Sequence, residues 1–326
     1  MFVTDALLEI KGLSTVFNTD YGIFPAIKDV NLSLKKGETL CVVGESGSGK
    51  TITSMSLMQL LPSSGKIASG EIIFQDTDLV KLNRKEMNKI RGKSISMIFQ
   101  DPMSALDPVY TCGSQITEAI QIHEDITREE AKKRAIELLK QVGIPHPETI
   151  FDAYPHELSG GMCQRVMIAM ALSCKPDLLI ADEPTTALDV TVQARILDLL
   201  KKIKKEFNMA ILLITHDLGV VAEMADRVAV MYAGQIVEEA DVLTIFKKPK
   251  HPYTKGLIKS VPPLHQKDKT LYSIPGTVPT INSMPKGCRF HPRCSFATEL
   301  CVEKEPELQR INPQHTAKCW HISEGV

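Results

Sequence analysis

One glycine-rich run constrains the fold of this chain more than any other feature of its sequence. The run consists of Gly44, Glu45, Ser46, Gly47, Ser48, Gly49, Lys50 and Thr51. It follows the apolar segment 40–43 and precedes the helical pattern of 52–61, which is the strand, loop and helix order of a Walker A sequence. Glycines let the backbone approach a phosphate, and N–H groups of the loop and of the helix start point at the negative charge. We therefore expect Lys50 to reach the β- and γ-phosphates of a nucleotide and Thr51 to coordinate Mg²⁺.

Two carboxylates follow a second apolar segment. Asp182 and Glu183 come directly after the Leu-Leu-Ile-Ala segment 178–181. A carboxylate at the C-terminal end of a parallel strand faces the crevice in which open α/β sheets bind their ligands. We expect Asp182 to help hold Mg²⁺ from its outer coordination sphere, and Glu183 to orient and polarise an attacking water.

Short β-branched runs alternate with longer amphipathic patterns through the first two thirds of the chain. The expected strands are 72–74, 94–99, 178–181, 211–215 and 227–232, and the expected helices are 127–142 and 192–207. Such alternation is typical of parallel strands joined by crossover helices and predicts a layered α/β fold. The composition changes after 235–238, and from Pro249 onward Pro, Gly, His and Cys become frequent while helical periodicity fades. We therefore predict two domains, 1–240 and 241–326, with a boundary near Asp241.

Charge and hydropathy exclude some partners. Lys and Arg number 38 against 39 Asp and Glu, so no overall field would recruit nucleic acid or an anionic membrane surface. The first residues do not resemble a secretory signal, which predicts a cytosolic protein. The longest apolar runs are far shorter than the roughly 20 residues that cross a bilayer, so other chains must span any membrane at which this protein works.

The segment Leu158-Ser159-Gly160-Gly161-Met162 resembles the signature of the ATP-binding-cassette family. The resemblance implies a P-loop NTPase cassette with a mixed-sheet core and a helical subdomain. It also implies that Ser159, Gly160 and Gly161 close on the γ-phosphate of an ATP held by a second subunit, so that one composite site needs two chains. Many members have Gln where this chain has Met162, but Ser159 and the two glycine amides provide the phosphate contacts.

Four further positions resemble functional residues of that family. Phe17 lies where the family stacks an aromatic ring on adenine, although an isolated Phe in an N-terminal strand is about as often core. Gln100 resembles the glutamine that contacts Mg²⁺ and water on a loop that touches membrane subunits. Asp189, in 186–189, resembles the aspartate that communicates across the dimer, and His216 resembles the switch histidine that contacts the γ-phosphate.

The tail narrows the resemblance to one branch of the family. The segments 251–254 (His-Pro-Tyr-Thr), 274–276 (Ile-Pro-Gly) and 285–294 resemble the C-terminal extension of oligopeptide and dipeptide importer ATPases. This resemblance implies a peripheral ATPase on the cytoplasmic face of the membrane. Its expected partners are a second ATPase, preferably a related chain rather than a second copy, two permease subunits and, indirectly, an extracytoplasmic peptide-binding protein.

The eight cysteines fall into two groups. Cys41, Cys112, Cys163 and Cys174 are scattered through apolar segments and are expected to be buried. The second group is Cys288, Cys294, Cys301 and Cys319, which lie in the small Cys-rich tail. Four thiolates suit a zinc ion or an iron–sulfur cluster, and intervals of five, six and seventeen residues contain no close pair of the kind that zinc prefers. The resemblance implies a [4Fe–4S] cluster, with Zn²⁺ or four reduced thiols as alternatives.

Two rival functions remain open at this point. An importer ATPase of this kind can serve another cargo, such as nickel, sugars or opines, because cargo is selected by other subunits. A soluble cassette protein acting on DNA or ribosomes would usually carry a long coiled coil or two cassettes in one chain, and this sequence has neither.

Overall fold

Strand β3 (Thr39–Val43) leads through the Walker A loop into helix α1 (Lys50–Leu57), in the order that the sequence predicts. The helix is shorter than the predicted 52–61, because Met58 caps it and Gln59 takes a left-handed backbone conformation with φ of 49°. The structure, a computed structural model, describes residues 6–185, 188–261 and 272–322.

The chain forms two compact units. The described residues of the first unit lie within Met1–Leu34, Thr39–Val80 and Ile214–Val326, and those of the second within Lys35–Glu38 and Lys81–Leu213. The Walker A loop and the C-terminal extension therefore belong to the same unit, whereas the Asp182-Glu183 pair belongs to the other.

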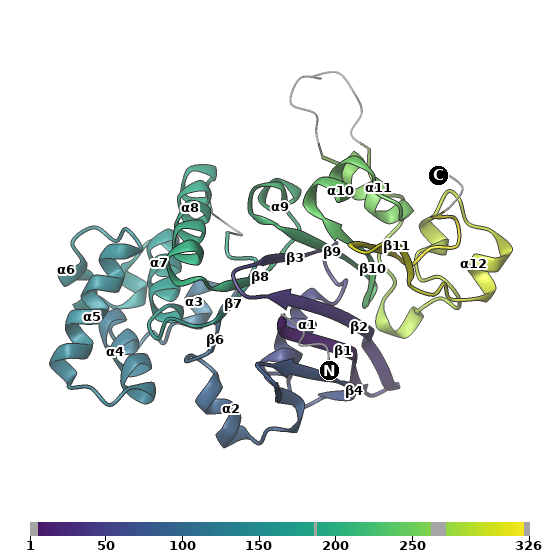
Figure 1. Cartoon of the computed structure of the whole chain (residues 1–326). Coiled ribbons are helices and arrows are strands. Elements are labelled where there is room, and N and C mark those ends of the chain that lie inside the picture. The colour runs from purple at the N-terminus through teal and green to yellow at the C-terminus, as the bar shows by residue number, and fades with distance from the viewer. Residues whose placement is uncertain (1–5, 186–187, 262–271, 323–326) are drawn as a thin grey trace. The chain divides into compact units, whose positions relative to one another are not determined.

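The first unit contains two sets of paired strands (Figure 1). One has the order β2-β1-β4-β5 and comprises β1 (Ala6–Thr19), β2 (Gly22–Lys35), β4 (Gly65–Phe74) and β5 (Thr77–Asp78). The other has the order β11-β12-β10-β9-β3 and adds β9 (Arg227–Tyr232), β10 (Gln235–Asp241), β11 (Gln309–Asn312) and β12 (His315–Ala317). β3 and β9 are parallel whereas β9 and β10 are antiparallel, so the predicted mixed sheet is confirmed.

The helices described in the first unit are α1, α9 (Leu218–Met224), α10 (Val242–Lys247), α11 (Pro252–Lys259) and α12 (Glu299–Glu303). The short 3₁₀ turns are η1 (Leu79–Lys81), η3 (Ile281–Ser283) and η4 (His291–Arg293). The extension adds to the sheet, because β12 pairs with β10 in antiparallel register, Glu238 opposite Ala317. Strands from both sides of the predicted domain boundary near Asp241, β10 and β12, thus pair with each other. The boundary stays a prediction.

The second unit has strands in the order β8-β7-β6, and its β6 (Ile95–Ile98) and β7 (Leu178–Asp182) are parallel. Most of β8 (Ala210–Thr215) belongs to the same unit. Its helices are α2 (Arg84–Ile90), α3 (Pro102–Ala105), α4 (Cys112–His123), α5 (Arg128–Gln141), α6 (Pro147–Asp152), α7 (Gly160–Ala171) and α8 (Val190–Phe207), with a 3₁₀ turn η2 (Pro155–Glu157). Helices α4 to α7 pack against one another and form the expected helical subdomain.

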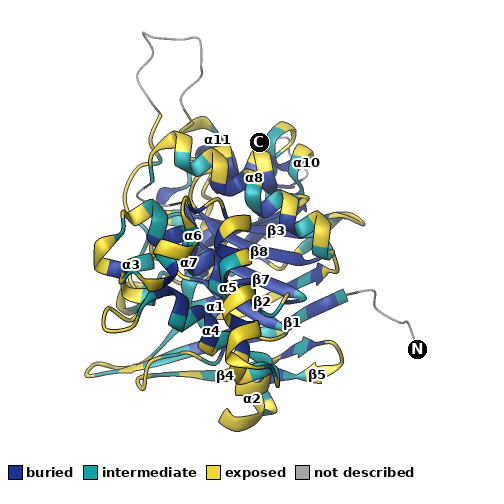
Figure 2. Ribbon diagram, turned by 90° about the vertical axis from the view of Figure 1, so that its left-hand side faces the viewer, coloured by how far each residue is buried: buried dark blue, intermediate teal, exposed yellow. Residues whose placement is uncertain are grey.

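Local signals explain where these helices begin. Thr127 and Glu130 form a reciprocal capping box at the start of α5, so the helix begins one residue later than the predicted 127. Asp189 caps α8 through its side chain, which makes this helix begin at Val190, two residues before the prediction. The strands β3, β7 and β8 are buried along their whole length (Figure 2). No helix in the described ranges combines the length and the apolar character needed to cross a membrane.

Candidate functional site

The Walker A loop is held in a conformation that only glycine accepts at two of its positions. Gly49 precedes α1 with φ of 105°, and a Cβ there would lie 2.8 Å from Ile27 Cγ2. A Cβ on Gly44 would lie 2.2 Å from the carbonyl oxygen of Met231, at the end of β9. The loop therefore passes close to the sheet, and its backbone is available to a ligand without side chains in the way.

The groups that face a bound anion come from the loop and from the first turn of α1. Lys50 is almost fully buried, and its ammonium donates to the carbonyl oxygens of Gly44 at 2.8 Å and Glu45 at 3.1 Å. The first bond to the helix backbone is donated by Thr53 N–H to Gly49 O, so the amides before it have no partner within the helix. The Ser48 hydroxyl is also buried and lacks a hydrogen-bond partner among the described residues. Together these donors form a cradle suited to phosphate.

In the second unit, the structure brings two predicted catalytic residues together. Gln100 follows β6 and Glu183 follows β7, and these strands are adjacent and parallel. The Gln100 side-chain amide donates to a Glu183 carboxylate oxygen at 3.0 Å. Glu183 has a left-handed backbone with φ of 48°, a conformation that is costly for a residue with a Cβ and that concentrates at functional sites. Asp182, the last residue of β7, is buried beside it.

Ser159 caps helix α7 and lies at its exposed N-terminal end. Its hydroxyl accepts from Met162 N–H at 3.4 Å, and its carbonyl accepts from Cys163 N–H at 2.9 Å. Ser159 and Gly160 are exposed, and apart from the chain neighbours and the backbone of α7 itself, no described atom lies within 4 Å of the place where a Cβ on Gly160 would be. This end of α7 is thus an open helix N-terminus that can accept an anion from outside the chain.

The remaining predicted residues have clear positions but no established roles. Phe17 is half-buried in β1, with its ring packed against Gly65 of β4. His216 directly follows β8 and is exposed. Asp189 caps α8 by accepting from Val192 N–H at 2.9 Å, whereas Thr186 and Ala187 of its motif lie outside the described residues. The adenine, γ-phosphate and dimer roles stay predictions.

The scattered and clustered cysteines differ in their surroundings. Cys41, Cys112 and Cys163 are buried as predicted and Cys174 is half-buried. Burial, helped by the nearby thiols of the other three tail cysteines, raises the pKa of Cys288 to about 11. The Cys288 amide donates to the Cys301 carbonyl at 2.8 Å, and Cys301 Sγ lies 3.7 Å from His321 Nε2.

The structure thus gathers the tail cysteines into one neighbourhood. In the part of the chain that it describes, no three His, Cys, Asp or Glu side chains are arranged to hold one metal ion.

Contacts of the extension with the Walker A loop were not predicted from the sequence. Arg293 forms an ion pair with Glu45, and the Tyr253 hydroxyl accepts from the Glu45 amide. Both extension residues lie in segments whose resemblance to peptide-importer ATPases is plain, but the sequence does not reveal that these segments meet the loop.

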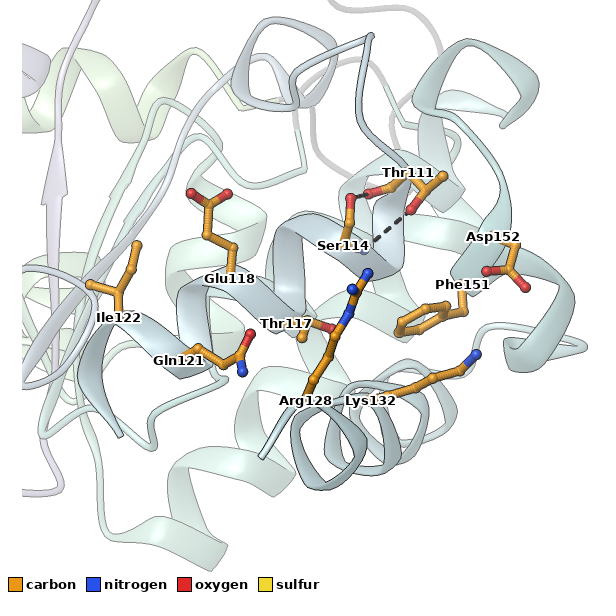
Figure 3. A pocket seen from close by; sticks show the side chains of 10 residues that line it. All are labelled: Thr111, Ser114, Thr117, Glu118, Gln121, Ile122, Arg128, Lys132, Phe151 and Asp152. Carbon is orange, nitrogen blue, oxygen red and sulfur yellow. Dashed lines mark hydrogen bonds between the residues drawn. The ribbon is translucent and has the colours of Figure 1, made fainter. Parts of the chain in front are cut away.

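A separate hollow of about 710 Å³ lies among α4, α5 and α6 of the second unit (Figure 3). Its lining mixes the cations Arg128 and Lys132 with the carboxylates Glu118 and Asp152. None of the predicted site residues lines this hollow.

Comparisons with known proteins cover both parts of the chain. Residues 27–186 match the family described as ABC transporter, and residues 237–301 match the oligopeptide/dipeptide transporter, C-terminal region. The chain is 54% identical to the oligopeptide transport ATP-binding protein OppD of Bacillus subtilis (strain 168), over 96% of this chain and 88% of the relative. It is 49% identical to the dipeptide transport ATP-binding protein DppD of Haemophilus influenzae, over 96% of this chain and 95% of the relative.

A solved structure agrees with the cassette part. The dimeric post-hydrolysis state of the ATP-binding cassette MJ0796, bound to ADP and Pi, superposes with a TM-score of 0.66 at 30% identity. The match covers 72% of this chain and 98% of that one.

Proposed function

Because the chain belongs to the ATP-binding-cassette transporter family, in its oligopeptide and dipeptide branch, we propose that it is the ATP-hydrolysing subunit of a peptide importer. The observation that carries this function is the similarity over nearly the whole chain, extension included, to ATP-binding proteins of peptide transport. The phosphate cradle around Lys50 supplies the physical basis for ATP binding.

Within the chain, the predicted site residues have different tasks. Lys50 and the amides at the start of α1 bind the β- and γ-phosphates. Thr51, Gln100 and Asp182 carry the oxygens that would hold Mg²⁺, which neutralises phosphate charge when bound. Glu183 accepts a hydrogen bond from the attacking water and so orients and polarises it, and the 3.0 Å bond from Gln100 supports this orientation. His216 is assigned to the γ-phosphate, and Phe17 to the adenine.

A second chain completes each site. The exposed N-terminus of α7, with Ser159, Gly160 and Gly161, binds the γ-phosphate of an ATP held in the opposing protomer, and Asp189 communicates across the same interface. ATP therefore closes the two cassettes, and hydrolysis releases them. The openness of this helix end supports the proposal.

The cassettes act on membrane partners at the cytoplasmic face. Two permease subunits form the path, an extracytoplasmic binding protein delivers the peptide, and the second ATPase is a related chain rather than a copy. The loop after Gln100 suits a permease contact, because Met103, Val109 and Tyr110 expose large apolar side chains there.

Cys288, Cys294, Cys301 and Cys319 are the ligands that we assign to a [4Fe–4S] cluster in the extension. The other three thiols lie near Cys288, and the intervals of five, six and seventeen residues lack the close pair that Zn²⁺ sites prefer. When bound, such a cluster cross-links a segment with little core of its own, and its binding free energy stabilises the fold.

The function is tested with the importer complex in lipid vesicles. We expect ATP hydrolysis that rises when peptide and binding protein are supplied, together with peptide uptake. Glu183→Gln should keep ATP binding and lose turnover. An active complex that imports nickel or sugar but no peptide would overturn the cargo, and normal turnover in Glu183→Gln would remove Glu183 from the chemistry.

The cluster is tested by composition and colour of the anaerobically purified chain. We expect about four irons per chain and visible absorption, both lost in a Cys301→Ser variant. One zinc per chain, with no iron, would reject the cluster.

A further inference from the structure

The C-terminal extension holds the side chain of a Walker A residue. Arg293 donates to the Glu45 carboxylate through both terminal nitrogens, Nη1 to Oε2 at 2.6 Å and Nη2 to Oε1 at 3.0 Å. The same guanidinium donates from Nε to the Pro275 carbonyl at 2.8 Å and is almost fully buried. Because its other donors are fixed by the extension backbone, Arg293 presents a rigid fork to the loop.

A second residue of the extension holds the backbone at the same position. The Glu45 amide donates to the Tyr253 hydroxyl at 2.9 Å. Tyr253 is completely buried, and its ring packs against Tyr232 at 4.6 Å and Phe290 at 5.4 Å between centroids. Burial raises the pKa of Tyr253, so this phenol stays neutral and can accept the bond.

The two contacts come from separate parts of the extension. Tyr253 lies in α11, at the start of the extension, whereas Arg293 lies forty residues later in η4. Phe290 joins them, because its ring also packs edge-on against Tyr232 at 5.1 Å. Tyr232 is the last residue of β9, which pairs with β3. The aromatic side chains that attach the extension to the sheet therefore also support the residues that contact the Walker A loop.

We propose that Arg293 and Tyr253 are positioning residues for ATP binding, which act through Glu45. Both fix the position of the Walker A loop, and Arg293 also neutralises the Glu45 carboxylate. This inference rests on the proposed function. An unpaired carboxylate at the second position of a phosphate loop repels the triphosphate, and Arg293 removes that repulsion while leaving the loop with its net attraction for anions.

The test measures ATP affinity in the full chain. Arg293→Gln is expected to weaken equilibrium binding of a fluorescent ATP analogue about tenfold, or about 1.4 kcal/mol, because the carboxylate is left uncompensated. In the importer complex, KM for ATP should rise similarly while kcat changes less than about twofold. The double variant Glu45→Gln/Arg293→Gln should bind ATP more tightly than Arg293→Gln alone, which a purely structural role of Arg293 would not produce.

Two more variants keep the result interpretable. Tyr253→Phe keeps the ring and removes only the hydroxyl, so it tests the same idea if Arg293→Gln does not fold; about threefold weaker binding is expected. Lys28→Gln is the matched control, because the Lys28–Glu305 ion pair of 2.7 Å also joins a strand to the extension without involving the Walker A loop. Its ATP affinity should equal that of the unmodified chain.

Two results would count against the inference. Unchanged affinity in both Arg293→Gln and Tyr253→Phe, with normal binding by the unmodified chain, overturns it and leaves the proposed function intact. No saturable binding by the unmodified chain overturns the proposed function as well.

Discussion

Replacing Phe290 by Ala should detach the extension from the sheet at a cost that the structure allows to be calculated. Phe290 is 4% exposed and contacts the rings of Tyr232, Tyr253 and His251, with centroids 5.1, 5.4 and 5.7 Å away. A buried Phe→Ala change costs about 3–5 kcal/mol in total, a range that already includes the contacts of the lost ring with its neighbours. We therefore expect a loss of about 4 kcal/mol.

The single tryptophan of the chain provides the assay. Trp320 lies in the extension, where its indole N–H donates to the Lys304 carbonyl at 3.2 Å, so its fluorescence reports on the extension rather than on the second unit. With an m-value of about 2 kcal/mol/M, a loss of 4 kcal/mol lowers the urea midpoint by about 2 M. The control is Phe296→Ala in the same segment, whose side chain is 46% exposed and whose loss should cost less than about 0.5 kcal/mol.

Comparing the urea midpoints of the two Phe variants tests whether the packing of Phe290 attaches the extension to the sheet. If Phe290→Ala shifted the midpoint no further than Phe296→Ala, the aromatic group would not attach the extension, and the packing argument would be refuted.

Two further predictions concern charge. Lys50→Ala should abolish measurable binding of ATP in equilibrium titration, because the loop loses its ammonium; retained affinity would remove Lys50 from the phosphate site. Burial alone would raise the pKa of Glu305, but hydrogen bonds from Lys28, Lys318 and Gln235 outweigh it and lower the pKa to about 2. Its stabilisation is therefore present above the ordinary pKa of 4.5 and is lost as pH falls toward 2. The difference in urea midpoint between the unmodified chain and Glu305→Gln should shrink over that range, and a difference that persisted at pH 2 would contradict this assignment.

The parts of the fold that the sequence predicts well are those that depend on local sequence patterns. The Walker A loop is defined by consecutive residues, and β9 has the predicted bounds 227–232 because its apolar run lies between Asp226 and the turn at Ala233-Gly234. Gln100 and Glu183 were each predicted to follow a strand, and the structure shows that these two strands are adjacent and parallel. Each of these features depends on residues that are close in sequence or on a simple sheet rule.

Features that depend on contacts between residues distant in the sequence could not be predicted from local patterns. Glu45 and Arg293 are separated by 248 positions, and nothing in either segment identifies the other as its partner. β12 is three residues long, and β11 is four, so neither carries a periodic pattern; they form because β10 offers an edge to pair with. The fading periodicity of the tail predicted a small domain and gave no sign of β11 and β12, which extend the sheet of the first unit.

ATP-driven association of the cassettes tests the central claim, that one triphosphate is bound between the Walker A loop of one protomer and the Ser159 end of α7 in another. The measurement is the mass of the Glu183→Gln chain with its partner ATPase, by analytical ultracentrifugation with and without ATP and Mg²⁺. We predict a stable dimer only with nucleotide, and its loss when Ser159 is changed to Arg. A mass that does not respond to ATP, or a dimer that tolerates Ser159→Arg, would contradict the composite site.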